Sequence, residues 1–550
     1  MDVSPAGGGD IYSDQFNYSY SHPPYSYPEN FSTESDYTLT AVPNAAGGYK
    51  FSYWEVETIT VACTGETITT RTSTINPISV NIEVNSQYVT AHFSKTGEPP
   101  PVIDDGDDDP NDDGGDDVID NPDDDGDDDP YDEVNETPAL FFQHVYAESP
   151  WKTVIAMINT NPAQSISGKL RAFSDTGNLI ETKSVTFAPR ERQEYNVVED
   201  FANPFVSDAN IGYVIFYSEA TGMRGYTQYS QAGLYRTAIP AATTVNTQNI
   251  YIPHIASNER FWTGISLLNT TSAARNPVIT FNNGRNAVIS LNAGEHKSFT
   301  ISSLFNGSQP DIKSAVITNA AGVLGQEIFG GQHHLDGIIL SDKTTATIYY
   351  PHVADMKSWW TGIVAYNPSI TNAQLTITPY SKSGEILTRS SLIIGGKDKY
   401  VGVVRSLNLP DQTAWFKINA TQPLVGFELF STLDNTRLAA YSEMNGAGSK
   451  QGVFPRIETD GWTGIAFVNA EGGQASVTLT AYTNGGAPLA ASTITVGGLA
   501  KVVSLADQIF APQNISLAGY IAFTSDRNVV GFQLTGSSDG TMLDGLPALY

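Results

Sequence analysis

The amino-acid sequence predicts an all-β protein arranged as a multidomain string: a small N-terminal module, an acidic linker and four tandem β-sandwich repeats. Three observations lead to this prediction. Strand-forming residues are common, with 11% aromatic side chains and many Thr, Val and Ile. A Trp-Thr-Gly-Ile motif recurs at a spacing of about 100 residues, which is typical of a repeated structural unit. One long Asp-rich run separates these repeats from the N-terminal residues.

The repeat is defined by the segments FWTGISLLN, SWWTGIVAYN and GWTGIAFVN. Their tryptophans, Trp262, Trp360 and Trp462, lie 98 and 102 residues apart, and Trp151 in PWKTVIAMIN, 111 residues before Trp262, marks a divergent first copy. An Asn follows each tryptophan at the seventh or eighth position. We therefore expect four repeats, which we number 1 to 4, at residues 138–247, 248–346, 347–450 and 451–550.

Glycines recur at two further places in each repeat. The first set closes turns of predicted hairpins, where a positive φ is needed, and comprises Gly177, Gly284, Gly384 and Gly485. The second set lies between two apolar strands and comprises Gly225, Gly325, Gly426 and Gly531. About seven short strands in a unit of about 100 residues indicate a β-sandwich, whereas a propeller blade would repeat about every 40 residues.

The N-terminal segment, residues 2–96, alternates apolar and polar residues from Tyr37 to Val42 and again from Ile78 to Val84, as strands do. It resembles the bacterial repeat domain, a divergent internalin-type B-repeat, in three motifs: LTA-x-P from Leu39, GY-x-F-x-x-W from Gly48, and NP followed by TA-x-F from Asn76. The resemblance implies a small β-grasp-like module of exported or surface-attached bacterial proteins, without catalytic activity.

The acidic linker, residues 97–137, concentrates the negative charge of the chain. The net charge is −30, and residues 97–138 contain 20 Asp or Glu and no Lys or Arg. Such a run predicts a self-repelling, extended spacer. Because carboxylates and flexible glycines can surround Ca²⁺, the spacer is also a candidate calcium site. The candidate ligands come from its two DDGDDDP segments: Asp104, Asp105, Asp107, Asp109, Asp124, Asp125, Asp127 and Asp129.

The recurring tryptophans allow two interpretations. In the first, each indole fills the same place in a sandwich core, because recurrence in every copy favours a structural role. In the second, each indole is exposed and stacks on a sugar ring, which would make the repeats a carbohydrate-binding array. Burial of the indoles would exclude the second interpretation.

Histidines precede three of the tryptophans, at His144, His254 and His352, and repeat 4 has Arg456 at this place. A metal site that accepts Arg is not expected, since a guanidinium has no lone pair to donate. We expect a polar contact between repeats instead. A separate cluster, His333, His334 and Asp336, occurs in one copy only, and adjacent residues of a strand point to opposite faces. We therefore do not expect metal binding there.

Composition excludes several partners. The acidic chain lacks the basic surface that nucleic acids require, and no stretch reaches the ~18 apolar residues of a membrane span. Cys63 is the only cysteine, so no internal disulfide can form. The first residues, MDVSPAGGGD, lack the basic and apolar regions of a signal peptide. Nucleophile-elbow, zinc-protease, phosphate-loop and dinucleotide motifs are absent from the sequence.

The sequence therefore predicts a non-enzymatic bacterial protein, extracellular or at the cell surface, that acts as a multivalent β-domain scaffold. It would be an adhesin, an envelope-layer component or a subunit of an extracellular filament, with other copies of itself or other surface proteins as partners. A carbohydrate-binding array that accompanies an extracellular enzyme, with polysaccharide as the partner, is the alternative. A hydrolase in repeat 1, at the polar segment YSEATGMRGYTQYSQ, is a third hypothesis.

Overall fold

The structure is a computed structural model of the 550-residue chain. It describes the strand backbones of the N-terminal module and residues 137–550, apart from 147–149, 202–210, 232–233, 332–334, 355–357, 434–437, 442–445 and 447. The described chain folds into two compact units, one before residue 136 and one after it. The prediction of an all-β fold is confirmed.

The N-terminal module contains two four-stranded sheets, in the orders β1-β8-β5-β6 and β3-β2-β4-β7. The pair β1 and β8 is parallel and the other pairs are antiparallel. The two segments with predicted alternation correspond to β4 and β7. The strands are β1 (Asp2–Ser4), β2 (Gly9–Ser13), β3 (Phe16–Tyr20), β4 (Ser35–Pro43), β5 (Tyr49–Ala62), β6 (Gly65–Ser73), β7 (Ile78–Ile82) and β8 (Ser86–Lys95).

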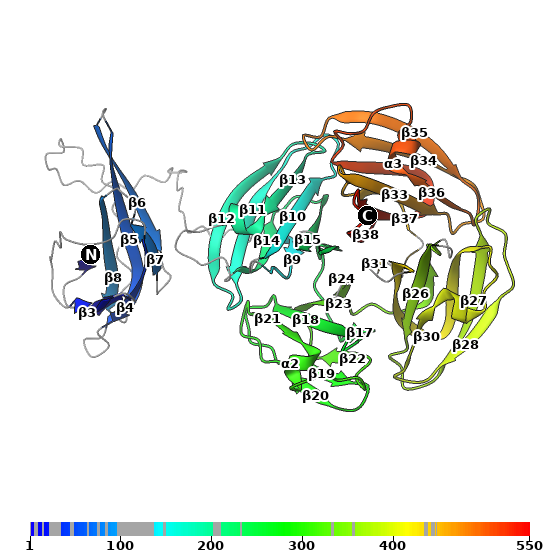
Figure 1. The fold of residues 1–550 in the computed structure, drawn as a ribbon, viewed down its shortest axis with the longest axis horizontal. Helices are drawn as coiled ribbons and strands as arrows, with labels where there is room; N and C mark the ends of the chain where they lie inside the picture. The colour runs from blue at the N-terminus through cyan, green and yellow to red at the C-terminus, as the bar shows by residue number, and fades with distance from the viewer. Residues whose placement is uncertain are drawn as a thin grey trace, which may run out of the picture. The chain divides into compact units, whose positions relative to one another are not determined.

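Each repeat is a sandwich of two antiparallel layers (Figure 1), which are separate four-stranded sheets in repeats 1 and 2 and are joined by a shared strand in repeats 3 and 4. We call the sheet that ends with the last strand of the repeat the inner sheet, and the other one the outer sheet. In repeat 1 the inner sheet has the order β13-β10-β15-β16 and the outer sheet β12-β11-β14-β9. The elements are β9 (Pro138–Phe142), β10 (Trp151–Asn159), β11 (Ile166–Ser174), β12 (Leu179–Phe187), β13 (Arg192–Asn196), α1 (Val197–Asp200), β14 (Ile211–Tyr217), β15 (Met223–Gln231) and β16 (Tyr235–Pro240).

Repeat 2 has the inner sheet β21-β18-β23-β24 and the outer sheet β17-β22-β19-β20. Its elements are β17 (Ile250–Ile252), β18 (Phe261–Asn269), β19 (Val278–Phe281), β20 (Asn286–Val288), β21 (His296–Thr300), α2 (Ile301–Leu304), β22 (Ala315–Thr318), β23 (Val323–Gly331) and β24 (Leu335–Leu340).

In repeats 3 and 4 one long strand belongs to both sheets and replaces the pair β14 and β15 of repeat 1. Repeat 3 contains β25 (Thr345–Tyr350), β26 (Trp359–Tyr366), β27 (Ala373–Ser381), β28 (Ser390–Ile394), β29 (Lys399–Val403), η3 (Val404–Leu407), β30 (Thr413–Thr432) and β31 (Leu438–Tyr441). Repeat 4 contains β32 (Ser449–Phe454), β33 (Gly461–Val468), β34 (Ala475–Tyr482), β35 (Pro488–Val496), β36 (Lys501–Leu505), α3 (Ala506–Phe510), β37 (Tyr520–Ser537) and β38 (Leu543–Pro547).

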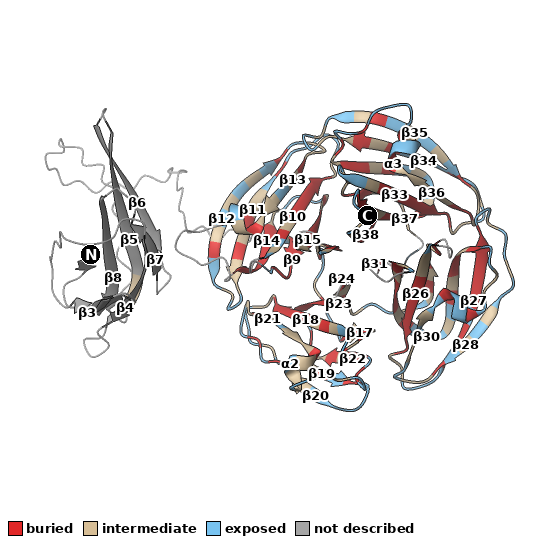
Figure 2. Cartoon of the chain, in the orientation of Figure 1, coloured by how far each residue is buried: buried red, intermediate tan, exposed pale blue. Residues whose placement is uncertain are grey.

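The four repeats close into a ring. The last strand of each repeat lies at the centre, where β16 contacts β24 and β38, and β31 also contacts both (Figure 1). Repeat 4 therefore packs against repeat 1, although they are the ends of this part of the chain. These central strands are almost fully buried, whereas exposed residues gather on outer strands and turns (Figure 2). The predicted string of repeats is thus a closed assembly.

Neighbouring repeats also share their hydrophobic cores. The core of repeat 2 includes Val364 and Phe427 of repeat 3, and the core of repeat 3 includes Val468 and Phe532 of repeat 4. These side chains are at most 2% exposed. Because apolar burial is the main stabilising contribution to a fold, the repeats depend on one another for part of their stability.

The tryptophan motif forms the second strand of each repeat, but its indoles do not fill the cores. Trp151, Trp262, Trp360 and Trp462 are all partly exposed. Among the tryptophans whose side chains the structure describes, Trp415 in β30 is the fully buried one. The interpretation of these indoles as core plugs is therefore wrong. The side chains that point into the core from this strand are the Thr and Ile of the motif, because side chains alternate between faces along a strand.

Trp151 is also one position out of register with the other three. The hydroxyls of Thr153 and Thr263 accept the same hydrogen bond, from the backbone amide seven residues earlier, so these threonines are equivalent. Trp151 lies two residues before its threonine and Trp262 one residue before. Lys152 consequently takes the place of the indole in repeat 1.

The Asn that follows each motif is the most closely repeated feature. Asn159, Asn269, Asn367 and Asn469 are 0% exposed. In repeat 2 the amide of Asn269 donates to the carbonyls of Ala273 and Asn292, at 2.8 and 2.6 Å, and its oxygen accepts from the amide of Thr271 at 3.0 Å. The other three make the same set of bonds. The Asn therefore fastens two loops to the end of its strand.

The recurring glycines occupy equivalent positions. Gly225, Gly325, Gly426 and Gly531 pair with the same position of the motif strand, at Met157, Leu267, Ala365 and Phe467. In the hairpin turns, Gly177, Gly284 and Gly384 have the expected positive φ, but in repeat 4 the positive φ belongs to Gly486 and not to Gly485. The turn Thr-Asn-Gly-Gly offered two glycines, and the hydrogen bond from Gly486 to Thr483 selects the second.

Candidate functional site

Buried ionisable side chains gather where one repeat meets the next. We name these contacts junctions 1–2, 2–3, 3–4 and 4–1, by the repeats that they join. Each junction pairs the His or Arg that precedes the tryptophan motif with the first residue of a strand in the following repeat. The first set is His144, His254, His352 and Arg456, and the second set is His296, Lys399, Lys501 and Arg192. The predicted role of the histidines as contacts between repeats agrees with this arrangement.

At junction 1–2 two imidazoles meet. The Nδ1 of His144 lies 3.2 Å from the Nε2 of His296, and the Nδ1 of His296 lies 2.6 Å from the Asp175 carboxylate. Burial, together with the neighbouring His296, lowers the pKa of His144 to about 3. His144 is therefore neutral at pH 7, which allows one ring nitrogen to accept a hydrogen bond.

Junctions 2–3 and 3–4 each bury a lysine beside a histidine and a glutamate. The ammonium of Lys399 lies 2.9 Å from the Nδ1 of His254. The ammonium of Lys501 donates to the carbonyl of Ala414 at 2.8 Å. Burial lowers the pKa of both lysines to about 7, against the attraction of the buried glutamates Glu327 and Glu428, respectively.

Glu327 and Glu428 occupy equivalent positions in repeats 2 and 3, and both are 0% exposed. Burial raises the pKa of each well above its ordinary value, and the nearby lysine opposes this rise. Junctions 2–3 and 3–4 therefore each bury a lysine, a histidine and a glutamate close together.

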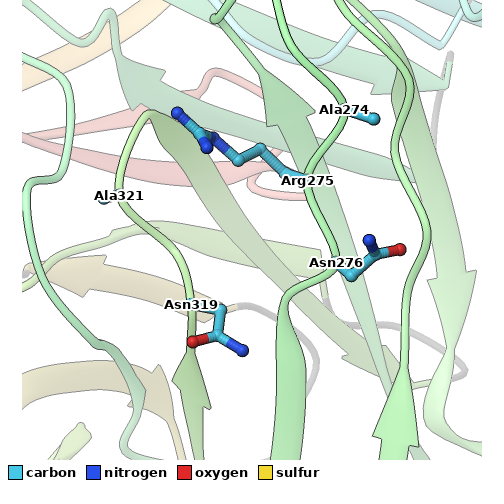
Figure 3. Close-up of a pocket in the computed structure, with 5 residues that line it drawn as sticks. All are labelled: Ala274, Arg275, Asn276, Asn319 and Ala321. Carbon is cyan, nitrogen blue, oxygen red and sulfur yellow. The ribbon is translucent and has the colours of Figure 1, made fainter.

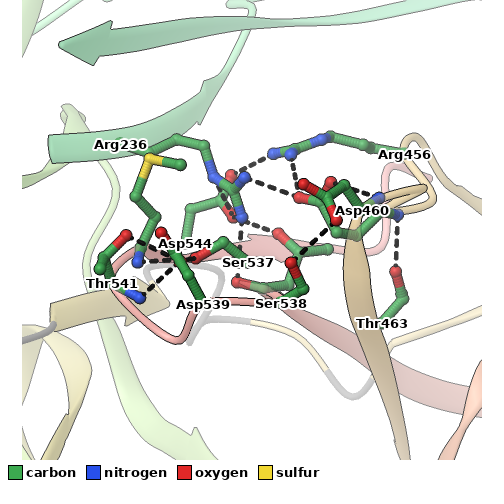
Figure 4. A network of polar contacts seen from close by, with 12 residues as sticks. Arg236, Arg456, Asp460, Thr463, Ser537, Ser538, Asp539, Thr541 and Asp544 are labelled. Atoms are coloured by element: carbon green, nitrogen blue, oxygen red, sulfur yellow. Dashed lines mark hydrogen bonds and ion pairs between the residues drawn. The ribbon is translucent and has the colours of Figure 1, made fainter. Parts of the chain in front are cut away.

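Junction 4–1 is an ion-pair network at the centre of the ring (Figure 4). The guanidinium of Arg236 in β16 lies 2.6 Å from Glu458 and 3.0 Å from Asp544. Arg456 contacts the same two carboxylates, at 2.5 and 2.6 Å. Two positive and two negative charges thus balance one another in a buried position. Since an unpaired buried charge is costly, the network holds the first repeat against the last.

Further bonds close this junction. Arg192 donates to the carbonyl of Pro455 at 2.8 Å, and the hydroxyl of Tyr520 donates to the carbonyl of Arg190 at 2.7 Å. Sequence reasoning missed Arg236, Glu458 and Asp544. A signal was present, because Leu-Asp-Gly occurs at the same place in repeats 2 and 4, at Asp336 and Asp544.

The cluster of His333, His334 and Asp336, which occurs in repeat 2 only, lies partly outside the described residues. His333 and His334 lie outside the described residues. Asp336 lies in the central strand β24, where its carboxylate accepts hydrogen bonds from the Thr237 hydroxyl at 2.7 Å and from the Gly337 amide at 2.6 Å. Burial raises the pKa of Asp336 to about 8, so this carboxyl is mainly protonated at pH 7.

A shallow depression of about 400 Å³ lies on repeat 2 (Figure 3). Its lining consists of Ala274, Arg275, Asn276, Asn319 and Ala321. These side chains provide one cation and two amides, but no nucleophile or acid–base pair. The depression therefore offers no arrangement for covalent or acid–base chemistry.

The remaining predicted site residues are placed as follows. The candidate calcium ligands Asp104 to Asp129 lie outside the described residues. In the part of the chain that the structure describes, no three His, Cys, Asp or Glu side chains are grouped so as to hold a metal ion. Among the described helices, none combines the length and apolar character that a membrane crossing needs.

Three of the motif indoles lie against glycines of the inner sheet. The ring of Trp262 covers Gly264, that of Trp360 covers Gly362 and that of Trp462 covers both Gly464 and Gly536. A Cβ at Gly536 would lie 2.5 Å from the Trp462 ring, so only glycine allows the indole to lie flat there. The glycine of the motif thus leaves the space against which the ring of its tryptophan packs.

No family model matches this chain, and no curated protein matches it.

Proposed function

We propose that the protein is a non-enzymatic, exported bacterial surface protein that acts as a rigid, multivalent scaffold. The observation that supports this proposal best is the closure of four like sandwiches into one ring by junctions of buried polar side chains. The histidines, lysines and glutamates whose pKa values are shifted by burial all lie at these junctions: His144, His254, His352, Lys399, Lys501, Glu327 and Glu428. A closed ring that presents four similar outer surfaces suits an adhesin, an envelope-layer component or a filament subunit.

The contacts between copies would use the free edges of the outer sheets. The strands β12, β20 and β28 each end a sheet and carry an exposed apolar residue: Leu179, Val288 and Ile393 are 50 to 62% exposed. An edge strand with exposed apolar side chains can pair with a strand of another molecule. In this proposal the acidic linker is a spacer, and calcium bound to its aspartates would stiffen it.

Assembly tests the proposal. Analytical ultracentrifugation and electron microscopy of the full chain, over a range of concentrations with and without calcium, should reveal ordered oligomers. A variant with Leu179→Lys, Val288→Lys and Ile393→Lys should stay monomeric, because charged edges resist pairing. The control is Ile370→Lys, at an exposed apolar residue that lies outside the strands. Monomers of the unchanged protein under all conditions would contradict the proposal.

A carbohydrate-binding array is the second candidate, and the indoles that pack against the motif glycines favour it. A flat, partly exposed indole is the surface on which the apolar face of a sugar ring stacks. Co-sedimentation with insoluble cellulose, chitin and peptidoglycan tests this function. Trp262→Ala and Trp462→Ala should each weaken binding, whereas Trp415→Phe, at the buried indole, should not. Equal binding by all variants, or no binding to the three polymers, would contradict this candidate.

A further inference from the structure

Three of the four junctions share a hydrogen bond from an aromatic side chain to a turn. The hydroxyl of Tyr213 donates to the carbonyl of Gly294 at 2.7 Å, across junction 1–2. At junction 3–4 the indole of Trp415 donates to Leu499 at 2.9 Å. At junction 4–1 Tyr520 donates to the carbonyl of Arg190. The three acceptors are equivalent, because each is the residue with positive φ in the turn before the strand that enters the junction.

The same three junctions share a second bond, from a backbone amide to a hairpin turn. The amides of His296, Lys501 and Arg192, each the first residue of its strand, donate to carbonyls of the preceding repeat. The acceptors are Asp175 at 2.8 Å, Lys382 at 3.0 Å and Asn484 at 2.8 Å. We call this bond, together with the aromatic bond, the turn latch.

Close packing accompanies the turn latch. A Cβ placed on Gly177 would lie 2.8 Å from Gly294, one on Gly384 would lie 2.2 Å from the Gly498 carbonyl, and one on Gly486 would lie 2.5 Å from the Pro189 carbonyl. In each case the contact is with the following repeat. The hairpin turn therefore sits directly against its neighbour at these three junctions.

Junction 2–3 has none of these three features. Ser314 occupies the position in repeat 2 that Tyr213, Trp415 and Tyr520 occupy in the other repeats. In every repeat, the residue just before this position accepts a backbone hydrogen bond from the segment that precedes the motif strand. The amide of Lys399 donates to the side chain of Asp398, in its own repeat, at 2.8 Å. A Cβ on Gly284 would meet nothing within 4 Å.

The hairpin turn of repeat 2 is bound to its own repeat instead. The side-chain oxygen of Asn282 accepts from the amide of Lys313 at 2.7 Å, and the guanidinium of Arg285 donates to Gln309 and covers the ring of Phe305. This turn is therefore not available to the next repeat in the way that the other three are.

Other contacts do hold junction 2–3. Val364 and Phe427 of repeat 3 belong to the core of repeat 2, the central strands β24 and β31 touch, and the side chain of Tyr366 is hydrogen-bonded to Ser314. The ammonium of Lys399 binds His254 and the carbonyl of Lys313. The ring of Phe427 packs on Phe329, with ring centres 5.7 Å apart. Junction 4–1, by contrast, adds four ion-paired side chains to its turn latch. The junctions therefore differ most between 2–3 and 4–1.

We propose that the ring opens at junction 2–3 while the other three junctions stay closed. Repeats 2 and 3 remain joined by the short connection between β24 and β25. Opening separates the turn at Gly284 from the turn at Lys397 and turns the ring into an open arc. This inference concerns the ring itself and does not depend on the proposed function.

Spin labels across two junctions test the opening. In the full chain with Cys63→Ser, the pair Asn283→Cys and Lys397→Cys spans junction 2–3, and the pair Thr176→Cys and Ala293→Cys spans junction 1–2. All four sites are exposed turn residues. Electron–electron double resonance should give a second, longer distance for the first pair and a single narrow distance for the matched pair. A single narrow distance for both pairs would overturn the proposal.

Hydrogen exchange of the unchanged protein gives an independent test. Peptides that cover residues 395–403 should exchange on the order of tenfold faster than the equivalent peptides 188–196, 292–300 and 497–505, because they lack the latch bonds. Tyr213→Phe removes one latch donor and should accelerate exchange of 292–300 about fivefold, while exchange of 395–403 in the same variant should be unchanged. Equal protection at all four junctions would overturn the proposal.

Discussion

Asp336 and Asp544 occupy the same position in two central strands, but their electrostatic environments are opposite. Asp336 in β24 lies beside the hydroxyl of Thr237 and has one carboxyl oxygen without a partner. Asp544 in β38 lies between the guanidinium groups of Arg236 and Arg456. The first is a neutral hydrogen-bonding group at pH 7, and the second is a charge in a balanced network.

Replacement of each aspartate by Asn should therefore have opposite consequences. Asp336→Asn should not destabilise the protein at pH 6, since an amide replaces a protonated carboxyl and folding no longer requires the uptake of a proton. Asp544→Asn should cost about 3 to 5 kcal/mol, because it leaves two buried arginines short of a counter-charge. Chemical denaturation of both variants measures this difference, and equal losses would contradict the assignment.

The same pair predicts a pH dependence. The pKa of Asp336 in the folded ring is raised to about 8 from 3.8, so its stabilising contribution is complete below the unfolded value and is lost as the pH rises through 8. The Asn variant cannot lose a proton there. Relative to the unchanged protein, Asp336→Asn should therefore become progressively more stable between pH 6 and 8 and gain little above pH 8, as measured by denaturation at each pH. A constant difference would show that Asp336 is already ionised at pH 6.

The buried asparagines allow a prediction about the loops that they fasten. Asn269→Ala should destabilise the protein by about 3 kcal/mol, because the carbonyls of Ala273 and Asn292 would lose their donor and the amide of Thr271 its acceptor. Asn286→Ala is the matched control, since Asn286 is exposed in β20, and it should change stability by less than ~0.5 kcal/mol. Thermal denaturation of the two variants measures the effect. A small loss for Asn269→Ala would mean that water replaces the amide.

At the scale of the element, sequence reasoning recovered the strands and lost their register in one place. The alternation of the motif strand and the spacing to Asn predicted the second strand of each repeat. Trp151 was aligned with the tryptophans of the other repeats, although the motif threonine is the equivalent residue. The spacing from Trp151 to Asn159 is eight residues, against seven in the other repeats, and this difference indicated the shift. The side chains that face the core are the less conspicuous Thr and Ile.

Hairpin turns differ in what their glycines touch, and substitution separates the two cases. Gly284→Ala should cost only about 1 to 2 kcal/mol, the strain of a positive φ, since its Cβ would enter open space. Gly384→Ala has the same strain and would also press its Cβ against the Gly498 carbonyl, so it should cost at least twice as much. Urea denaturation measures both. Equal losses of stability in the two variants would mean that the turn of repeat 3 can move away from Gly498 at little energetic cost.

At the scale of the whole molecule, the sequence predicted the repeated unit but not its closure. A period of about 100 residues indicates how long a unit is, whereas a ring depends on which faces of the units meet. Those faces are marked by single residues at corresponding places, and the residue type often changes between copies: His296, Lys399, Lys501 and Arg192 occupy one such place. Without the fold, nothing in the sequence aligns them.

Closure predicts that the ring unfolds as a unit. Deletion of repeat 4, residues 451–550, removes Val468 and Phe532 from the core of repeat 3 and removes the carboxylates that pair with Arg236 of repeat 1. Both neighbours should therefore lose stability, although neither is altered. Deletion of residues 1–135, which form the separate compact unit, is the control and should leave the transition of the ring unchanged.

Differential scanning calorimetry distinguishes a ring from independent domains. The unchanged ring should give one dominant transition, and the chain without repeat 4 should melt at a markedly lower temperature with reduced cooperativity, since two junctions are lost at once. If the first three repeats kept their transition temperature after the deletion, each sandwich would be stable alone. The shared cores and the ion pairs of junction 4–1 would then contribute little, and the scaffold would behave as a flexible chain of domains rather than as a rigid body.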